Sequence, residues 1–130
     1  MSETIFSKII KGEIPCHKVA ENEQFLAFLD IQPLVKGHVL VIPKIAVDYI
    51  FDMDDETLAE MIVFSKQISK KIKSAFPCKK IGVTVIGLEV PHAHIHLVPI
   101  NSMNDMNFAN QKLSLSSEEL SSLAEKISKA

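Results

Sequence analysis

Apolar and polar residues alternate over the chain in short runs that are typical of β-strands. Residues 19–20 and 25–29 are apolar and flank a polar stretch, which predicts a hairpin. Residues 37–43 are mostly apolar, which predicts a third strand that is buried on both faces. Residues 81–86 predict a fourth strand, and residues 91–99 predict a fifth.

Helical patterns occur at both ends of the chain and in its middle. Residues 5–12 predict a short amphipathic helix, and residues 55–75 a long one, with acidic side chains at its start, lysines at its end and Pro77 as its stop. Ser116 and Glu119 form a capping-box pattern that opens a last helix. The expected apolar stripe of the long helix consists of Leu58, Met61, Ile62, Ser65, Ile68, Ile72 and Ala75.

These elements predict an α+β fold, because the strands are grouped around one long helix. The expected architecture is a mostly antiparallel five-stranded sheet with the long helix, a short N-terminal helix and a C-terminal helix. No repeat or linker divides the sequence. We therefore expect a single domain over residues 1–130, with a core at about 5–100 and a C-terminal extension with a helix at 101–130.

Composition narrows the classes of partner. The net charge is −2 and aromatic residues make up 6%, so neither a basic field nor stacking platforms point to nucleic acid. No apolar run reaches the roughly 18 residues needed to cross a bilayer. Two cysteines outside any CxxC pair favour a reducing, cytoplasmic location. All fourteen basic residues are lysines, so a bound phosphate must be met by imidazoles, backbone N–H groups or lysines.

Three histidines, His92, His94 and His96, alternate with apolar residues. Side chains at i, i+2 and i+4 of a strand point the same way, so we expect all three imidazoles on one face. They can be structural, they can bind a metal with His38 as a further ligand, or they can perform nucleophilic catalysis on phosphorus. Spacing alone leaves these three interpretations open.

Residues 92–98 follow the pattern HφHφHφφ (φ apolar), which resembles the signature of the histidine triad (HIT) family of nucleotidyl hydrolases and transferases. Residues 5–15, 27–33 and 37–44 are similar to other blocks of that family, in the same order. The resemblance implies a HIT-like fold and hydrolysis of a purine nucleoside phosphoramidate or related adenylyl substrate, with release of AMP through a covalent nucleotidyl-histidine intermediate. The alternatives are a dinucleoside polyphosphate hydrolase and a nucleotide-binding regulatory module with weak turnover.

The resemblance also implies roles for four histidines. His94 is expected to be the nucleophile. His96 and His38 are expected to line the α-phosphate pocket, and His92 to support the hydrogen-bond network of the nucleophile. No metal is expected among these catalytic residues.

Four further residues match substrate-binding positions of the family. Asp30 is expected to bind the ribose hydroxyls, because a carboxylate accepts from both. Ile31, Phe6 and Ile9 are expected to form the apolar slot for the purine. Asp30 also fits a turn, and Phe6 and Ile9 also fit plain core positions.

The stretch Gly87-Leu88-Glu89-Val90 departs from the family pattern, which often has Gly-Gln-Ser/Thr before the triad. If Glu89 contacts the leaving group, its negative charge disfavours polyphosphates and favours phosphoramidates or acyl-adenylates, and a chain without arginine has little to offset it. Glu89 can equally point to solvent. Thr4 and Ser7 stand where some bacterial members carry zinc-binding cysteines, so structural zinc of that kind is not expected.

We expect no resident cofactor, although magnesium can assist polyphosphate substrates. The expected partner is a purine nucleotide, without nucleic acid or membrane. Relatives of this family are usually two-fold homodimers in which the long helix and a strand pair across the axis. Residues 39–42, residues 49–51 and the long helix supply apolar surface for such a homodimer.

Overall fold

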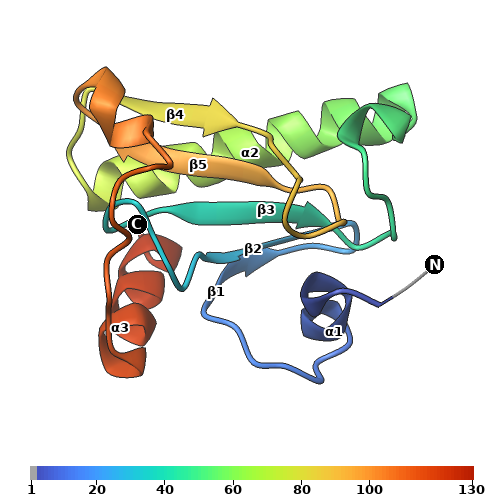
Figure 1. The fold of residues 1–130 in the computed structure, drawn as a ribbon, viewed down its shortest axis with the longest axis horizontal. Helices are drawn as coiled ribbons and strands as arrows, with labels where there is room; N and C mark the ends of the chain where they lie inside the picture. The colour runs from blue at the N-terminus through green and yellow to red at the C-terminus, as the bar shows by residue number, and fades with distance from the viewer. Residues whose placement is uncertain (1–2) are drawn as a thin grey trace.

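A five-stranded antiparallel sheet forms the centre of the structure, a computed structural model that describes residues 3–130 (Figure 1). The strands follow the spatial order β1-β2-β3-β5-β4, and each neighbouring pair is antiparallel. The predicted α+β class with its antiparallel sheet is confirmed. The strands are β1 Lys18–Glu21, β2 Phe25–Leu29, β3 Val39–Pro43, β4 Lys80–Thr84 and β5 Ile95–Ile100.

The helices begin where their capping residues predict. Helix α1 (Ile5–Ile10) starts at a capping box in which Thr4 and Ser7 bond reciprocally, so these two side chains cap the helix. Helix α2 (Asp55–Ala75) covers the predicted residues, and α3 (Ser117–Ser128) opens with the expected Ser116–Glu119 box. Two short 3₁₀ turns, η1 (Ile50–Asp52) and η2 (Met103–Met106), complete the described elements.

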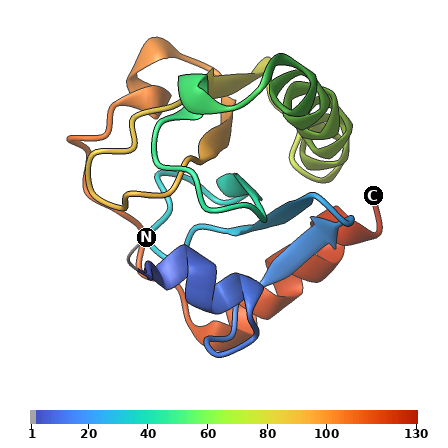
Figure 2. The same ribbon diagram turned by 90° about the vertical axis from the view of Figure 1, so that its right-hand side faces the viewer.

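The two faces of the sheet are covered by different helices (Figures 1 and 2). Along β2, Phe25, Ala27 and Leu29 join one core cluster with residues of α2 and α3. Leu26 and Phe28 join a second cluster with residues of α1. The alternation follows from the period-2 geometry of a strand. It leaves β3 buried on both faces, as predicted, and β2 as well.

The strand that carries the histidines begins later than predicted. Regular pairing with β3 starts at Ile95, so His92 and His94 precede β5. The backbone turns aside there, because His92 N–H donates to the Val90 carbonyl (2.8 Å) and Ala93 N–H to the Val47 carbonyl (2.7 Å). The neighbouring β4 consequently ends at Thr84, which pairs with His96, and the predicted strand residues 85–86 are exposed loop.

Two predictions of apolar surface need correction. Ile62, placed on the buried stripe of α2, is 50% exposed, while Phe64 is buried against the sheet. Residues 39–42 lie in the interior of the sheet and provide no surface for a second copy. Tyr49 and Phe51 are exposed and pack edge to face on each other.

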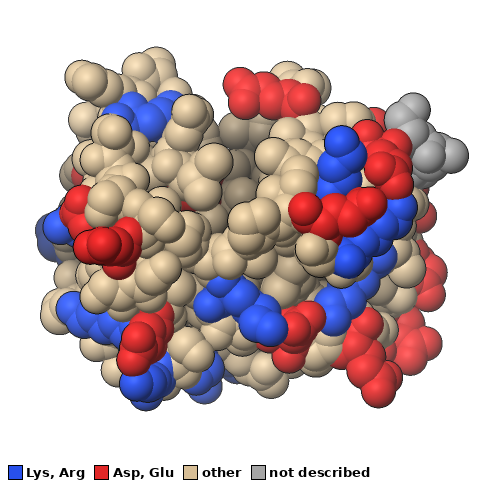
Figure 3. Space-filling view, turned by 90° about the horizontal axis from the view of Figure 1, so that it is seen from below, with Lys and Arg blue, Asp and Glu red and all other residues tan. Residues whose placement is uncertain are grey.

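Charged side chains of both signs are mixed on the surface of the described residues. On the face drawn in Figure 3, lysines are interspersed with acidic side chains rather than gathered in one broad basic area. None of the helices within residues 3–130 combines the length and the hydropathy that a bilayer span requires. The surface feature that bears on function is a cavity on the α1 side of the sheet.

Candidate active site

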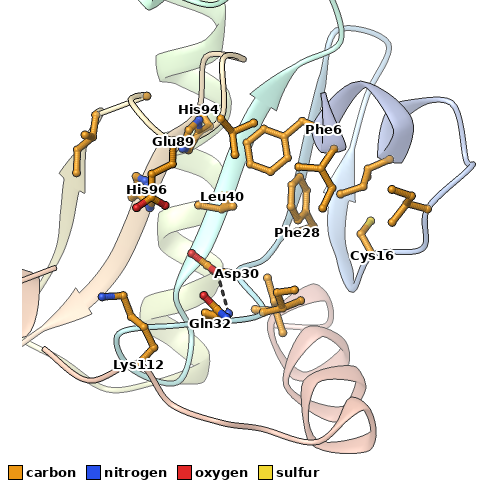
Figure 4. A pocket seen from close by; sticks show the side chains of 18 of the residues that line it. Phe6, Cys16, Phe28, Asp30, Gln32, Leu40, Glu89, His94, His96 and Lys112 are labelled. Carbon is orange, nitrogen blue, oxygen red and sulfur yellow. Dashed lines mark hydrogen bonds between the residues drawn. The ribbon is translucent and has the colours of Figure 1, made fainter. Parts of the chain in front are cut away.

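A cavity of about 530 Å³ lies between α1, the ends of β2 and β5, the loop that joins β4 to β5, and the segment after η2 (Figure 4). It is apolar towards α1, where Phe6 and Ile9 line it, and polar towards β5, where His94 and His96 line it. Asp30 also lines the cavity, and in Figure 4 it lies below Phe6 and His94. The cavity therefore combines an apolar slot with a histidine-bearing wall, the usual make-up of a small-molecule site.

The proton of His94 is positioned by the main chain. Its Nδ1 lies 2.7 Å from the carbonyl oxygen of His92. A carbonyl only accepts, so Nδ1 must donate and must carry a proton. In the neutral ring the lone pair is then on Nε2. The Phe6 ring packs edge to face on His94 with a centroid separation of 5.0 Å, which limits rotation of the imidazole.

His38 and His96 form a directed hydrogen-bond chain. The backbone N–H of Leu34 donates to His38 Nδ1 (3.0 Å), so this nitrogen carries no proton. His38 Nε2 lies 3.0 Å from His96 Nδ1, and in the neutral pair it is the donor. His96 is then protonated on Nε2. The chain thus presents an N–H on His96, beside the Nε2 lone pair of His94.

Burial keeps this pair neutral. It lowers the pKa of His38 to about 3, with repulsion from His96 and Lys112 adding to the effect. It lowers the pKa of His96 to about 4, with His94 contributing in the same direction. His38 is only 1% exposed and stands behind His96, not on the cavity wall. Of the two rings expected at the phosphate pocket, the structure places His96 on the cavity wall and His38 behind it, because the bonds to Leu34 N–H and to His96 hold the His38 ring there.

His92 also lies behind the cavity. Its Nε2 donates to the carbonyl of Pro43 (2.9 Å), and burial lowers its pKa. Its ring packs edge to face on Phe6 with a centroid separation of 6.0 Å. The link from His92 to His94 runs through the His92 carbonyl, and not through its imidazole.

Asp30 follows β2 directly and lies at the cavity. Its Oδ1 accepts from the backbone N–H of Gln32 (2.9 Å), and its Oδ2 lies 3.6 Å from His38 Nε2. Burial raises the pKa of Asp30, while the Gln32 N–H, His94 and Lys112 act in the opposite direction. Its carboxylate can accept hydrogen bonds from a ligand that reaches into the cavity.

Asp30, His38 and His96 also form the one group of possible metal ligands found in the described part of the chain, with atoms within 4.8 Å of one another. A metal held by His38 Nε2 and His96 Nδ1 requires a lone pair on both nitrogens. The His38–His96 hydrogen bond places a proton between them. A bound metal would therefore have to replace that bond.

The apolar end of the cavity is formed by residues from α1 and from around β2. Phe6 is buried and packs edge to face on Phe28 with a centroid separation of 5.7 Å. Ile9 lines the same end, and Ile31 covers it from the surface with 61% of its side chain exposed. The three residues predicted for an apolar slot are thus brought together.

The loop before the histidines forms the rim of the cavity. Gly87 adopts a positive φ of 71°, a conformation that favours glycine, and lets the chain turn after β4. Leu88 is 89% exposed, and Glu89 is exposed but still lines the cavity. Glu89 therefore has access both to solvent and to a ligand in the cavity.

Among the wall residues that the sequence did not indicate are Phe108 and Lys112, from the segment after η2. The Phe108 ring packs edge to face on His96 and His38, with centroid separations of 4.9 Å and 6.1 Å. Their segment is brought to the site by a long-range bond in which Leu113 N–H donates to the Pro33 carbonyl (2.9 Å). The polar stretch that contains them carries no local signal of this contact.

Comparison with known proteins places this geometry in a family. The model of the HIT domain matches residues 11–103. An adenosine 5'-monophosphoramidase of Schizosaccharomyces pombe is 36% identical over 126 residues, which cover 95% of both chains. An adenosine 5'-monophosphoramidase of Saccharomyces cerevisiae is 40% identical over 96 residues, which cover 73% of this chain and 61% of that protein.

Solved structures show the same fold. A Hit-like protein involved in cell-cycle regulation from Bartonella henselae matches with a TM-score of 0.85 and 33% identity, over 98% of this chain and 95% of that chain. A Zn-bound histidine triad family protein from Mycobacterium smegmatis matches with a TM-score of 0.80 and 26% identity, over 96% of this chain and 93% of that chain.

Proposed function

The chain belongs to the HIT family, and on this premise we propose that it hydrolyses a purine nucleoside phosphoramidate or a related adenylyl substrate and releases AMP. The observation that carries the proposal is the pairing of two imidazoles in one cavity. His94 presents a lone pair on Nε2, and His96 presents an N–H. A nucleophile beside a hydrogen-bond donor is what displacement at an anionic phosphorus requires.

The reaction proceeds in two displacements. His94 Nε2 attacks the phosphorus, the N–P bond forms, and the bond to the leaving amine breaks as the amine takes up a proton from solvent. Water then attacks the same phosphorus, the N–P bond breaks, AMP leaves and one proton returns to solvent. The His92 carbonyl accepts from Nδ1–H throughout and stabilises the positive charge of the phosphorylated ring.

The other residues hold the substrate in place. The N–H of His96 donates to a phosphoryl oxygen, and His38 maintains that tautomer. Asp30 accepts from the ribose hydroxyls, and Phe6, Ile9 and Ile31 enclose the purine. This scheme uses no resident cofactor, and magnesium serves only to screen a polyphosphate substrate.

The position of Glu89 at the rim of the cavity supports the proposal that phosphoramidates or acyl-adenylates are better substrates than dinucleoside polyphosphates. An ionised carboxylate repels a polyphosphate leaving group and can accept a proton from a cationic amine. Sequence reasoning found little to offset this charge. Lys112 on the same cavity supplies one positive charge, so the discrimination is expected to be moderate.

A homodimer is also part of the proposal. Tyr49 and Phe51 are 57% and 70% exposed, and Ile62 and Val63 present apolar surface on α2. β4 stands at the edge of the sheet. Burial of these side chains against a second copy would remove apolar area from water.

The test is incubation of the full chain with adenosine 5'-phosphoramidate and with a diadenosine polyphosphate, with AMP followed by chromatography. We expect AMP from the phosphoramidate, and none after His94→Ala, because Nε2 of this ring forms the covalent bond. His17→Ala, outside the cavity, is the matched control and should retain activity. If the native protein binds AMP but releases none from either substrate, the hydrolase proposal is wrong and a regulatory binding module is supported.

A further inference from the structure

The charges on the cavity wall are uneven. Asp30 and Glu89 are acidic, and Lys112 is the one lysine among the described residues that line the cavity. The chain has no arginine, and His38 and His96 are neutral at pH 7. A nucleotide phosphate that enters this cavity therefore meets two carboxylates and one fixed ammonium group. Without Lys112, the fixed charge of the wall would be wholly negative.

Lys112 is anchored, and its charge is not neutralised. Its Nζ donates to the carbonyl oxygens of Phe108 and Asn110, the latter at 3.2 Å. An ammonium group has three N–H donors, so one remains for a ligand. Four other lysines form ion pairs with carboxylates. By contrast, no carboxylate oxygen of residues 3–130 lies within 4.0 Å of Lys112 Nζ. Within the described residues, the half-buried ammonium group thus has carbonyl partners and no carboxylate at ion-pair distance.

The position of Lys112 favours the reacting end of a nucleotide. In Figure 4 it lies at the opposite end of the cavity from Phe6, with Asp30 between them. Its Nζ is 5.8 Å from the Phe108 ring centroid, and that ring packs against His96. A phosphate oxygen that accepts from the His96 N–H would therefore lie on the same side of the cavity as this ammonium group.

We propose that Lys112 binds an anionic oxygen at the reacting end of the substrate, which is carried either by the transferred phosphate or by an acidic leaving group. The proposal rests on the proposed function. It makes the segment after η2, which lies beyond the residues matched by the family model, a part of substrate recognition. It also supplies the cation that a chain without arginine otherwise lacks at this site.

Two matched pairs of ligands distinguish the two sources of charge. AMP and adenosine differ by the phosphate, and their affinities are measured by calorimetry. The adenosine 5'-phosphoramidates of β-alanine and β-alaninamide differ by one carboxylate on the leaving group, and their kcat/KM values are compared. Each measurement is made on the native chain, on Lys112→Met, Lys112→Gln and Lys112→Arg, and on Lys79→Met, an exposed lysine that does not line the cavity.

We expect Lys112→Met to lower either the AMP-to-adenosine affinity ratio or the β-alanine-to-β-alaninamide ratio of kcat/KM about tenfold. A tenfold change corresponds to the loss of one charge-assisted hydrogen bond. A fall in the AMP-to-adenosine ratio identifies the transferred phosphate, and a fall in the β-alanine-to-β-alaninamide ratio identifies the leaving group. Lys112→Arg should restore the ratio. Lys112→Gln, which can still donate to the carbonyls but is neutral, should not, and Lys79→Met should match the native chain.

Other results overturn the inference. Unchanged ratios in Lys112→Met show that the ammonium group does not contact the substrate. Equal losses for charged and neutral ligands, or restoration by Lys112→Gln, show that it only holds the Phe108 segment in place. If the native chain binds AMP and cleaves either phosphoramidate, these results leave the proposed function standing. If it does neither, the proposed function fails, and this inference fails with it.

Discussion

Acidification from pH 7 to pH 5 should destabilise the native state through two histidines. In the unfolded chain a histidine has a pKa of about 6.5, whereas burial lowers the folded pKa of His38 to about 3 and of His96 to about 4. Below pH 6.5 the unfolded state therefore binds more protons than the native state. The free energy of unfolding is therefore unaffected by the titration of these two rings well above pH 6.5, and it decreases as the pH falls towards their folded pKa values. Between pH 7 and pH 5 each ring loses about 2 kcal/mol, or about 4 kcal/mol for the pair.

This loss is large against a typical stability of roughly 5–15 kcal/mol. Burial raises the pKa of Asp30, which opposes the loss, and lowers the pKa of His92, which adds to it, so about 4 kcal/mol is the share of His38 and His96 alone. The assay is urea unfolding at pH 7, 6 and 5, with the free energy of unfolding extrapolated to water. His38→Gln should remove about half of the pH dependence, and His17→Gln, outside the cluster, should leave it unchanged. A change below about 1 kcal/mol in the native chain would refute the assignment of two neutral buried rings.

Three further predictions concern the site and the assembly. Chelator treatment should leave phosphoramidate cleavage unchanged, because the proposed chemistry uses an imidazole nucleophile; activity lost to chelator and restored by zinc would move the site to the metal interpretation. Glu89→Gln and Glu89→Ser should raise polyphosphate cleavage relative to phosphoramidate cleavage several-fold, and an unchanged ratio in both variants would remove Glu89 from substrate selection. Light scattering at micromolar concentration should give the mass of two chains and Phe51→Glu should lower it, whereas a monomeric native protein would contradict the homodimer.

Much of the fold could be predicted from local pattern. Helix α2 begins and ends as expected, since Asp54, Pro77 and the helical period all act within a few residues. The strand ends were less predictable. Residues 85–86 are apolar and favour a strand, but the neighbouring segment turns away before Ile95 and leaves them without a ladder. That turn depends on a bond to the Val47 carbonyl, which no local pattern indicates.

The candidate site also contains residues that local spacing predicts and residues that only long-range contacts place. The spacing of His92, His94 and His96 predicted one shared face, but His94 and His96 line the cavity while His92 lies behind it, because regular strand geometry begins only at Ile95. The position of His38 behind His96 depends on a contact between residues 58 positions apart, which spacing does not specify. Lys112 lies in a polar stretch that reaches the cavity only through contacts with distant residues, so its place could be found only in three dimensions.

The two groups that orient the imidazole protons, Leu34 N–H and the His92 carbonyl, belong to the peptide backbone. Every residue except proline brings the same amide and carbonyl, so most side-chain exchanges at positions 34 and 92 leave these two groups in place. The tautomers of His38 and His94 are therefore little affected by side-chain substitutions at positions 34 and 92. The cavity walls have no such protection, because their character is that of their side chains. Evolution can accordingly refit this pocket to a new leaving group while the reacting imidazoles keep their orientation.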